Sequence, residues 1–269
     1  MKTNIPRVIL DGTLFDLDHA GRQFIQTGYA ENRISYDSLE RHGDYYLLNY
    51  NSEKKQVMSP TGIRSHQDEL KVISIHQAIL TEPANALDTG GFCKVHNQQS
   101  YARDLGILLV DEAIDGRLGG KLPIIDIDGY PFYVDLRMRA LRPHDDVMNL
   151  LEFKDMYLYK KDEFQCFYEP FTHQLVKLDI SITEFPKGIV GIYVPSEKQL
   201  DPISYARLAG LGETSLLPKY PQQTGLKAEV RPLYKTWLGA QVRQNRKDEA
   251  QEAIAIIQTP AKRKKGKSL

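Results

Sequence analysis

Two pairs of oppositely charged residues and two Tyr-Ala-Arg segments have the residue types and spacing that could do chemistry. An Asp and an Arg lie four positions apart near the start of the chain and again near its middle. A Ser-Tyr-Ala-Arg segment follows each pair. Carboxylates, guanidinium groups and phenols that converge in one pocket are typical of hydrolases and transferases. The resulting candidate cleft residues are Asp18, Arg22, Tyr101, Arg103, Asp135, Arg139, Tyr205 and Arg207.

These residues also have a purely structural interpretation. If Asp18 and Arg22 lie on a helix, they form an i,i+4 ion pair worth about 0.2–0.5 kcal/mol. The tyrosines would then pack, and the arginines would cap helices or pair with carboxylates. His66 and His173 have no HExxH, CxxC or paired-histidine spacing near them. The Gly-rich segment 116–121 lacks the spacing of a phosphate loop, so the sequence predicts no catalytic residue, no metal site and no cofactor.

Residues 126–129, Asp-Ile-Asp-Gly, follow an apolar run. They resemble the aspartate motif of phosphatases of the haloacid dehalogenase type, which implies Asp126 as nucleophile and Asp128 as acid/base. However, Tyr130 stands where that motif has a small hydroxyl residue. Ile9 replaces the first aspartate in a similar segment near the N-terminus. A β-hairpin with an Asp-Gly turn accounts for both segments, because a type I′ turn needs positive φ at both central residues.

The chain shows signs of an internal duplication. At a shift of 117 positions, Pro6, Asp11, Gly12, Phe15, Asp18 and Arg22 fall on Pro123, Asp128, Gly129, Phe132, Asp135 and Arg139. Further matches follow in the same order at smaller shifts: Tyr46-Leu47 with Tyr157-Leu158, Pro60 with Pro170, His66-Gln67 with His173-Gln174, Ile-Ser-Ile at 73–75 with 180–182, and Ser-Tyr-Ala-Arg at 100–103 with 204–207. Loop losses in the second copy would give such a falling shift. We expect paired domains, because each copy is large enough for its own core.

Each copy is expected to form a small antiparallel sheet covered by one or two helices. A second hairpin follows the Asp-Gly hairpin, and in the second copy its strands are rich in aromatic residues, which are Tyr157, Tyr159, Phe164, Phe167 and Tyr168. Asp201 suits the N-cap of a closing helix and Pro202 its first turn. The predicted fold class is α+β. It comprises two tandem hairpin-based domains at residues 1–120 and 121–225, followed by a C-terminal helix and a basic disordered tail at residues 226–269.

The composition describes a soluble globular protein. Its 269 residues leave room for about two domains, with 41% hydrophobic and 26% charged residues. No apolar run approaches the ~20 residues of a membrane span, and the N-terminal residues lack the apolar core of a secretory signal. Cys93 and Cys166 do not fall on matched positions and are interpreted as free, buried thiols. We expect a cytoplasmic protein without a membrane partner.

The net charge of zero hides an asymmetry. Residues 226–269 contain eleven Lys and Arg against four Asp and Glu, so the rest of the chain is acidic. The basic cluster near the C-terminus consists of Lys262, Arg263, Lys264, Lys265 and Lys267. Such a cluster can neutralise phosphates and bind nucleic acid in a salt-dependent way. An acidic protein partner and a merely solubilising terminus are alternatives, and the helix that contains Trp237 is a candidate docking arm for another protein.

These observations favour a non-enzymatic binding or scaffold protein with duplicated domains, which contacts nucleic acid or an acidic partner through its tail. Exposed aromatics on a strand edge would offer an interface. The alternative is a hydrolase or transferase with its site in the cleft between the two repeats, where Asp135, Arg139, Tyr205 and Arg207 converge. An enzyme requires polar groups gathered in a concave pocket. A scaffold requires an exposed apolar patch or a basic face.

Overall fold

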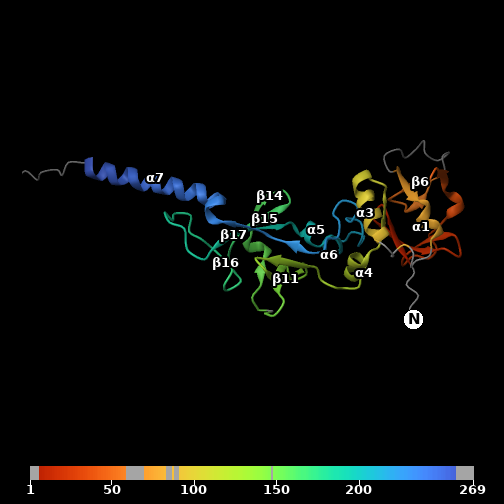
Figure 1. Cartoon of the computed structure of the whole chain (residues 1–269), viewed down its shortest axis with the longest axis horizontal. Coiled ribbons are helices and arrows are strands. Elements are labelled where there is room, and N and C mark those ends of the chain that lie inside the picture. The colour runs from red at the N-terminus through yellow and green to blue at the C-terminus, as the bar shows by residue number, and fades with distance from the viewer. Residues whose placement is uncertain (1–5, 59–69, 83–86, 88–90, 147, 259–269) are drawn as a thin grey trace, which may run out of the picture. The chain divides into compact units, whose positions relative to one another are not determined.

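The structure is a computed structural model that describes residues 6–58, 70–82, 87, 91–146 and 148–258, without the side chains of residues 255–258. It is a mixed α+β protein with several antiparallel sheets (Figure 1). This confirms the predicted fold class at the level of α+β architecture. The basic tail lies outside the described residues.

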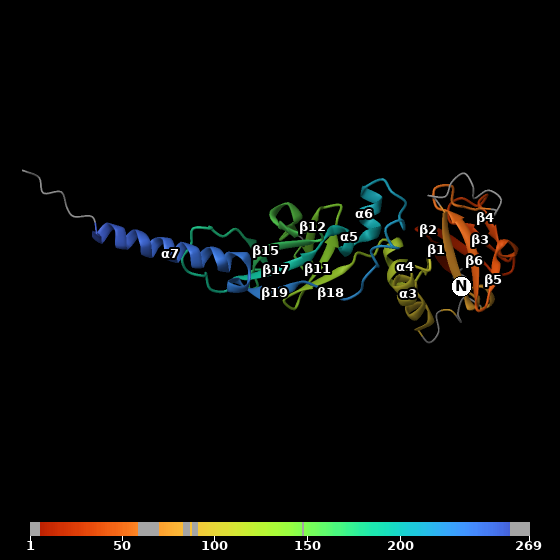
Figure 2. The same ribbon diagram turned by 90° about the horizontal axis from the view of Figure 1, so that it is seen from above.

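The first sheet begins with a meander of four short strands. Its strand order is β4-β3-β2-β1-β9, where the strands are β1 (Arg7–Leu10), β2 (Thr13–Asp18), β3 (Gln23–Gln26), β4 (Arg33–Ser35) and β9 (Ile107–Leu109). The strands β1 to β4, which we call the first meander, are drawn in red to orange in Figure 2. Asp11 and Gly12 connect β1 and β2 with φ angles of 42° and 84°. Both angles are positive, which confirms the predicted hairpin turn.

The second sheet has the same order of elements. Its strand order is β13-β12-β11-β10-β18, where the strands are β10 (Ile124–Ile127), β11 (Tyr130–Asp135), β12 (Ala140–Pro143), β13 (Leu151–Glu152) and β18 (Leu226–Lys227). We call β10 to β13 the second meander. Asp128 and Gly129 form its first turn, with φ angles of 56° and 85°. In each sheet the fifth strand comes from much later in the chain and pairs with the first strand of the meander.

A short 3-10 helix and a further sheet follow each meander. After η1 (Tyr36–Ser38), the central strand β6 (Tyr45–Asn51) pairs with β5 (Glu40–His42), β7 (Gln56–Val57) and β8 (Leu70–His76). After η5 (Phe153–Asp155), the central strand β15 (Glu163–Glu169) pairs with β14 (Tyr157–Lys160), β16 (Gln174–Val176) and β17 (Val190–Pro195). One strand, β19 (Glu229–Pro232), extends the later sheet beyond β17.

The described helices lie between and after these strands. They are α1 (Gln77–Thr81), α3 (Phe92–Arg103), α4 (Glu112–Leu118), α5 (Glu197–Leu200), α6 (Pro202–Leu208) and α7 (Trp237–Gln258), with η6 (Leu233–Lys235) before α7. The predicted start of α6 is confirmed, because the Asp201 side chain accepts a hydrogen bond from the Ser204 backbone N–H at 3.0 Å and Pro202 occupies the first turn. The Ser-Tyr-Ala-Arg segments lie in the C-terminal halves of α3 and α6.

Each meander packs an aromatic pair beneath it. Phe15 of β2 and Tyr50 of β6 are fully buried, with ring centroids 6.4 Å apart and ring planes at 76°. Phe132 of β11 and Tyr168 of β15 are equally buried, with centroids 6.5 Å apart and ring planes at 71°. Such edge-to-face pairs contribute ~0.5–1.5 kcal/mol beyond the area that they bury.

Two of the predicted matches between the copies are wrong in position. Tyr46 lies in the central strand β6, whereas Tyr157 lies in β14, at an edge of its sheet. The Ile-Ser-Ile at 73–75 belongs to β8, whereas residues 180–182 lie in no strand. Apolar residues recur in every strand, so short identities among them do not fix which strands correspond.

The chain divides into two compact units. The first contains residues 1–124, 133–139 and 196–226, and the second contains residues 125–132, 140–195 and 227–269. The first unit therefore includes α5 and α6, although these helices follow the second meander in sequence. Compactness and sequence repetition are different criteria, so the predicted boundaries at residues 120 and 225 stay predictions.

Candidate functional site

The candidate cleft residues Asp18 and Arg22 belong to a turn. Asp18 ends β2, and its carboxylate accepts hydrogen bonds from the Gly21 N–H at 2.8 Å and from Nε2 of Gln23 at 2.9 Å. The bond from Gln23 and then that from Gly21 lower the pKa of Asp18. Arg22 has a positive φ of 51° and lies 3.5 Å from Asp37. The prediction of a helical ion pair between Asp18 and Arg22 is therefore wrong, because the two residues lie at the ends of a tight turn and not on a helix.

Asp135 and Arg139 form the corresponding turn after β11. The buried Asp135 carboxylate accepts hydrogen bonds from the backbone N–H groups of Arg137 and Met138, at 3.2 and 3.4 Å. Arg139 has a φ of 53°, and its guanidinium lies 3.8 Å from the Glu197 carboxylate. The aspartate therefore stabilises the turn, and the arginine makes an exposed ion pair that contributes little.

The tyrosines and arginines of the closing helices have partners of their own. Tyr101 packs against an apolar cluster that includes Ile9 and Ile203, and burial raises its pKa. Arg103 is exposed in the last turn of α3. The Arg207 guanidinium donates to Glu213 at 2.7 Å and to the Leu118 carbonyl oxygen at 3.2 Å. The Lys198 ammonium lies 5.2 Å from the centre of the Tyr205 ring.

No contact joins two of the eight candidate cleft residues within the part of the chain that the structure describes. Their convergence on one cleft therefore stays a prediction. His66 and the basic cluster Lys262, Arg263, Lys264, Lys265 and Lys267 lie outside the described residues. Nucleic-acid binding by this cluster stays a prediction as well.

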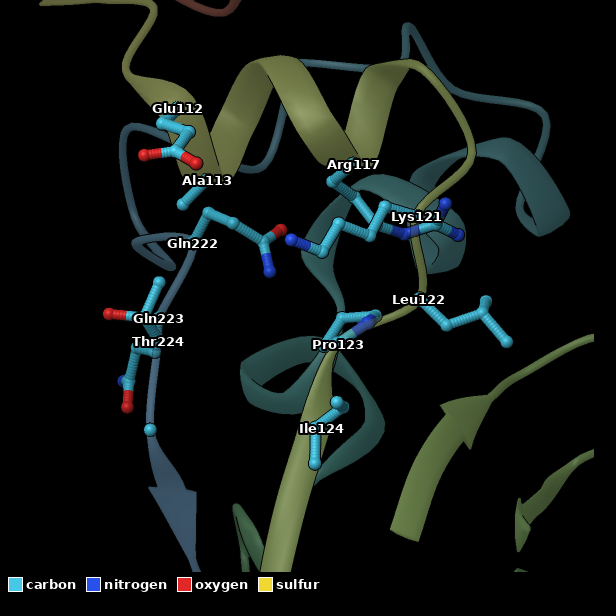
Figure 3. Close-up of a pocket in the computed structure, with 11 residues that line it drawn as sticks. Glu112, Ala113, Arg117, Lys121, Leu122, Pro123, Ile124, Gln222, Gln223 and Thr224 are labelled. Carbon is cyan, nitrogen blue, oxygen red and sulfur yellow. The ribbon is translucent and has the colours of Figure 1, made fainter. Parts of the chain in front are cut away.

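A pocket of about 320 Å³ lies in the first compact unit, beside α4 (Figure 3). Arg117 and Asp201 form a buried ion pair at its wall, with Nε and Oδ2 2.8 Å apart, and burial raises the pKa of Asp201. The side chains of Lys121 and Gln222 extend into it. The buried Gln222 Oε1 has no hydrogen-bond partner among the described residues. The pocket can hold a small polar molecule, but it contains no hydrogen-bonded acid–base pair open to a substrate.

A network of aromatic rings and a carboxylate lies beside the second meander. His173 stacks on Tyr130 with ring centroids 3.7 Å apart, and its Nδ1 lies 2.9 Å from the Tyr168 hydroxyl. The Tyr130 hydroxyl donates to Asp145, which raises the pKa of Tyr130 to about 12 and lowers that of Asp145. No local sequence pattern indicates this network, because separate strands and turns bring its members together. Its polar groups bond to one another, which is typical of a structural network.

The β14 edge consists of three consecutive exposed side chains. Tyr157, Leu158 and Tyr159 are 56%, 66% and 41% exposed, and β14 is the outermost strand of the order β14-β15-β17-β19. Trp237 packs at its side, with its ring centre 6.5 Å from that of Tyr157. Exposed apolar residues in a row on an outer strand are a liability that proteins usually avoid, so their presence suggests a partner.

The other aromatic residues of this hairpin are part of the protein interior. Phe167 and Tyr168 are 3% and 0% exposed, and Phe164 packs against Phe153 with ring centroids 5.6 Å apart. Cys166 is also buried, and burial raises its thiol pKa to about 12. The predicted aromatic interface therefore reduces to the residues of β14 and the adjacent Trp237.

A notch of about 280 Å³ adjoins the β14 edge within the second compact unit. It exists because β14 and β16 pair with different halves of β15 along the same side, through residues 163–165 and 167–169. Tyr157, Val176 and Lys177 line it. Polar side chains line it as well, among them Asn149, Asp155 and Gln174, so the notch offers both apolar and polar contacts.

The charges around the β14 edge are balanced. Three cations pair with three carboxylates at 2.6 to 3.7 Å, which are Lys154–Glu152, Lys177–Asp155 and Lys160–Glu163. A phosphate-binding face needs unpaired cations. This edge therefore suits an apolar segment of protein better than nucleic acid.

The corresponding strand after the first meander has the opposite chemistry. The β5 edge consists of Glu40, Arg41 and His42, all of them exposed, and it borders β6 as β14 borders β15. Charged side chains on an outer strand block further strand pairing. The two outer strands occupy equivalent places in their sheets, and only one of them is open to a partner.

Comparison of the chain with protein-family models, with curated proteins and with solved structures finds no match. The described residues contain no group of three or more His, Cys, Asp or Glu that could hold a metal ion. Within the same residues, no helix combines the length and the apolar character needed to cross a membrane.

Proposed function

We propose that this chain is a non-enzymatic binding or scaffold protein that takes up an extended protein segment by strand addition at the β14 edge. The observation that carries the proposal is the row of three exposed apolar side chains on an outermost strand. The outer side of such a strand presents backbone N–H and C=O groups that a new strand can bond.

The two faces of β14 define what the segment must look like. Tyr157 contacts Trp237, and Tyr159 contacts Tyr193 with ring centroids 5.1 Å apart, so both tyrosines lie on one face of the sheet. Leu158 lies on the other face, since successive strand residues alternate. Both faces of this edge are apolar, so a segment with apolar residues in succession and little net charge fits it.

We also propose that the two halves are copies of one unit. Three observations support this: the meanders have the same strand order, the same aromatic pair lies under each, and residues with positive φ recur. The matching positive-φ residues are Asp11 and Asp128, Gly12 and Gly129, Arg22 and Arg139, and Lys55 and His173. At the shift of 117, Glu40, Arg41 and His42 correspond to Tyr157, Leu158 and Tyr159. In the second copy, apolar residues therefore stand where charged residues protect the edge strand of the first copy.

Fluorescence of Trp237 tests the binding function, because this is the one tryptophan of the chain and it lies against Tyr157. The probe is a set of short peptides with valine and leucine in succession and with neutral ends. We expect a saturable change in emission for the full chain, with a dissociation constant on the order of 0.1–1 mM for so small a contact.

The matched control gives the β14 edge the residues of the β5 edge: Tyr157→Glu, Leu158→Arg and Tyr159→His. All three positions are exposed, so the variant should fold with an unchanged circular dichroism spectrum. It should lose the peptide-dependent change in emission. An equal response from both proteins, or no response from the full chain at millimolar peptide, would refute binding at this edge.

A further inference from the structure

We propose that the pocket beside α4 binds a small zwitterion, a molecule whose carboxylate and ammonium groups are joined by a short aliphatic chain. The Lys121 ammonium holds the ligand's carboxylate, and the Glu112 carboxylate holds its ammonium group. All residues that line the pocket belong to the first compact unit, whereas β14 belongs to the second. This site is therefore additional to the strand-addition surface.

Two oppositely charged side chains line the pocket without pairing with one another. They are Glu112 and Lys121. Neither makes an ion pair with any residue that the structure describes. A ligand that carries one charge of each sign satisfies both side chains. A simple anion or a simple cation satisfies one of them and is repelled by the other, so the lining favours a zwitterion.

The second cation in the lining, Arg117, already has a counter-charge. Its Nε donates to Oδ2 of Asp201 at 2.8 Å, and the two side chains are 6% and 0% exposed. Asp201 also accepts a hydrogen bond from the Ser204 backbone N–H at the start of α6. Separating a buried ion pair leaves an uncompensated charge, which is strongly unfavourable. Arg117 therefore forms a fixed wall, and of the two lining cations Lys121 is the one available to a ligand.

The Gly-rich segment 116–121 positions Lys121. The Lys121 backbone N–H donates to the Gly116 carbonyl oxygen at 2.9 Å, and Gly120 has a φ of 100°, a conformation that favours glycine. A Cβ on Gly116 would lie 3.5 Å from Cδ of Lys121, so this side chain folds back over α4. It extends into the pocket (Figure 3). The segment that lacks the spacing of a phosphate loop thus places a lysine in the pocket.

The two charges are separated along α4, and apolar residues line the same pocket. Glu112 is the first residue of α4, and Gly116, which contacts the Lys121 side chain, follows four residues later, about 6 Å along the helix axis. Pro123 and Ile124 also line the pocket, and Ile124 is 42% exposed. A ligand whose charged ends are joined by an aliphatic chain covers this apolar surface and reaches both charges.

Gln222 supplies a further polar contact. Its side chain extends into the pocket (Figure 3), and its buried Oε1 has no hydrogen-bond partner among the described residues. A buried acceptor without a donor is unfavourable. The terminal torsion of a glutamine side chain is soft, so a small turn of the amide brings this oxygen to a ligand. The ligand's ammonium group has three N–H donors, enough for Gln222 and Glu112 together.

Three probes of equal chain length test the need for both charges in the full chain. They are 4-aminobutyrate, butyrate and butylamine, titrated at low salt and followed by saturation-transfer difference NMR. We expect a dissociation constant on the order of 1 mM for 4-aminobutyrate, which has about seven non-hydrogen atoms. Butyrate and butylamine should each bind at least about tenfold more weakly, because each leaves one charge of the pocket without a counter-charge.

Two substitutions that keep side-chain size assign each end of the ligand. In Glu112→Gln the ligand's ammonium group loses its partner, so 4-aminobutyrate and butyrate should bind within about threefold of one another. In Lys121→Met the ligand's carboxylate loses its partner, so 4-aminobutyrate and butylamine should become similar. Because each comparison removes one group from the ligand and one from the protein, it isolates a single contact.

Lys94→Met is the matched control. Lys94 is an exposed lysine of α3 that does not line the pocket, and its loss should leave all three affinities unchanged. Glu112 and Lys121 are exposed as well, so both pocket variants should fold with an unchanged circular dichroism spectrum. The proposal is overturned if 4-aminobutyrate does not bind at about 10 mM, or if butyrate or butylamine binds as tightly. A preference for 4-aminobutyrate that persists in both pocket variants overturns it as well.

Discussion

The β5 edge blocks the pairing of a further strand, whereas the β14 edge leaves such pairing possible. Both are outermost strands that follow a four-stranded meander and a 3-10 helix. Glu40, Arg41 and His42 protect the first edge, whereas Tyr157, Leu158 and Tyr159 leave the second open. Beneath them, the pairs Phe15–Tyr50 and Phe132–Tyr168 keep nearly the same geometry. The core constrains side-chain volume and shape closely. An exposed edge carries no such constraint and can acquire a new role.

The largest expected effect tests whether the two cores are energetically equivalent. Phe15→Ala and Phe132→Ala each remove a fully buried ring that contacts a buried tyrosine. Each should lower the free energy of unfolding by about 3–5 kcal/mol. Urea unfolding followed by far-ultraviolet circular dichroism measures the loss, and Trp237 emission reports separately on the second compact unit.

Phe171→Ala is the control, because this ring is 93% exposed and its loss should change stability by less than about 0.5 kcal/mol. If one of the core substitutions cost under about 1 kcal/mol, the corresponding pair would not be a true core contact. The two meanders would then differ in how much their aromatic pairs stabilise the fold.

The second effect depends on pH and concerns the helix α3. His96 is 4% exposed and stacks on Phe92, and its Nε2 has no partner among the described residues. Burial, and then the nearby His76, lower the pKa of His96 to about 4 from its ordinary value of 6.5. As the pH falls, His96 therefore takes up a proton at a higher pH in the unfolded chain than in the folded chain. The contribution of His96 to stability is complete above pH 6.5 and is lost as the pH falls toward 4.

The shift corresponds to about 3 kcal/mol lost between neutral pH and pH 4. His96→Leu should remove this part of the pH dependence. Leucine is a suitable replacement, because the shift of 104 that aligns the two Ser-Tyr-Ala-Arg segments places the buried Leu200 at this position. Urea unfolding between pH 4 and 8 measures the effect. His42→Gln, at an exposed histidine, is the control. A pH profile that His96→Leu leaves unchanged would contradict a neutral, buried imidazole.

The two Asp-Gly hairpins were predictable because their signals are local. Asp-Gly encodes positive φ at two successive positions, and the meanders keep one constant shift from Pro6 to Arg22. The same shift, continued to Glu40, places Glu40 on Tyr157 and so aligns β5 with β14. The predicted match of Tyr157 with Tyr46 relied on apolar identities, which residues of any strand can provide.

The candidate site was less predictable, because it depends on the fold beyond neighbouring residues. Exposure of Leu158 depends on β14 being last in its sheet, and the burial of Phe167 depends on strands on both sides of β15. The spacing of Asp18 and Arg22 suited a helix and a tight turn equally. Only the positive φ of Arg22 distinguishes the two.

The smallest expected effect is on the stability of the Asp-Gly turns at the start of the two meanders. Gly12→Ala and Gly129→Ala both force alanine to a φ near 85°, which costs ~1–2 kcal/mol. A Cβ on Gly129 would meet no atom within 4 Å, whereas one on Gly12 would lie 2.8 Å from the Ser215 Cα. Because backbone cannot give way cheaply, Gly12→Ala should cost a further ~1–3 kcal/mol.

Urea unfolding of the two glycine variants measures this difference directly. Equal losses would mean that the Ser215 loop moves freely away from the first turn, although the Thr214 hydroxyl donates to the Gly12 carbonyl oxygen at 2.7 Å. Thr214→Val in the Gly12→Ala background tests whether this hydrogen bond holds the Ser215 loop against the turn. If it does, loss of the bond lets the loop move away from the alanine Cβ. Thr214→Val then costs less stability in the Gly12→Ala variant than in the unchanged chain. Such a result would show that the two turns share a backbone conformation and differ only in what packs on them.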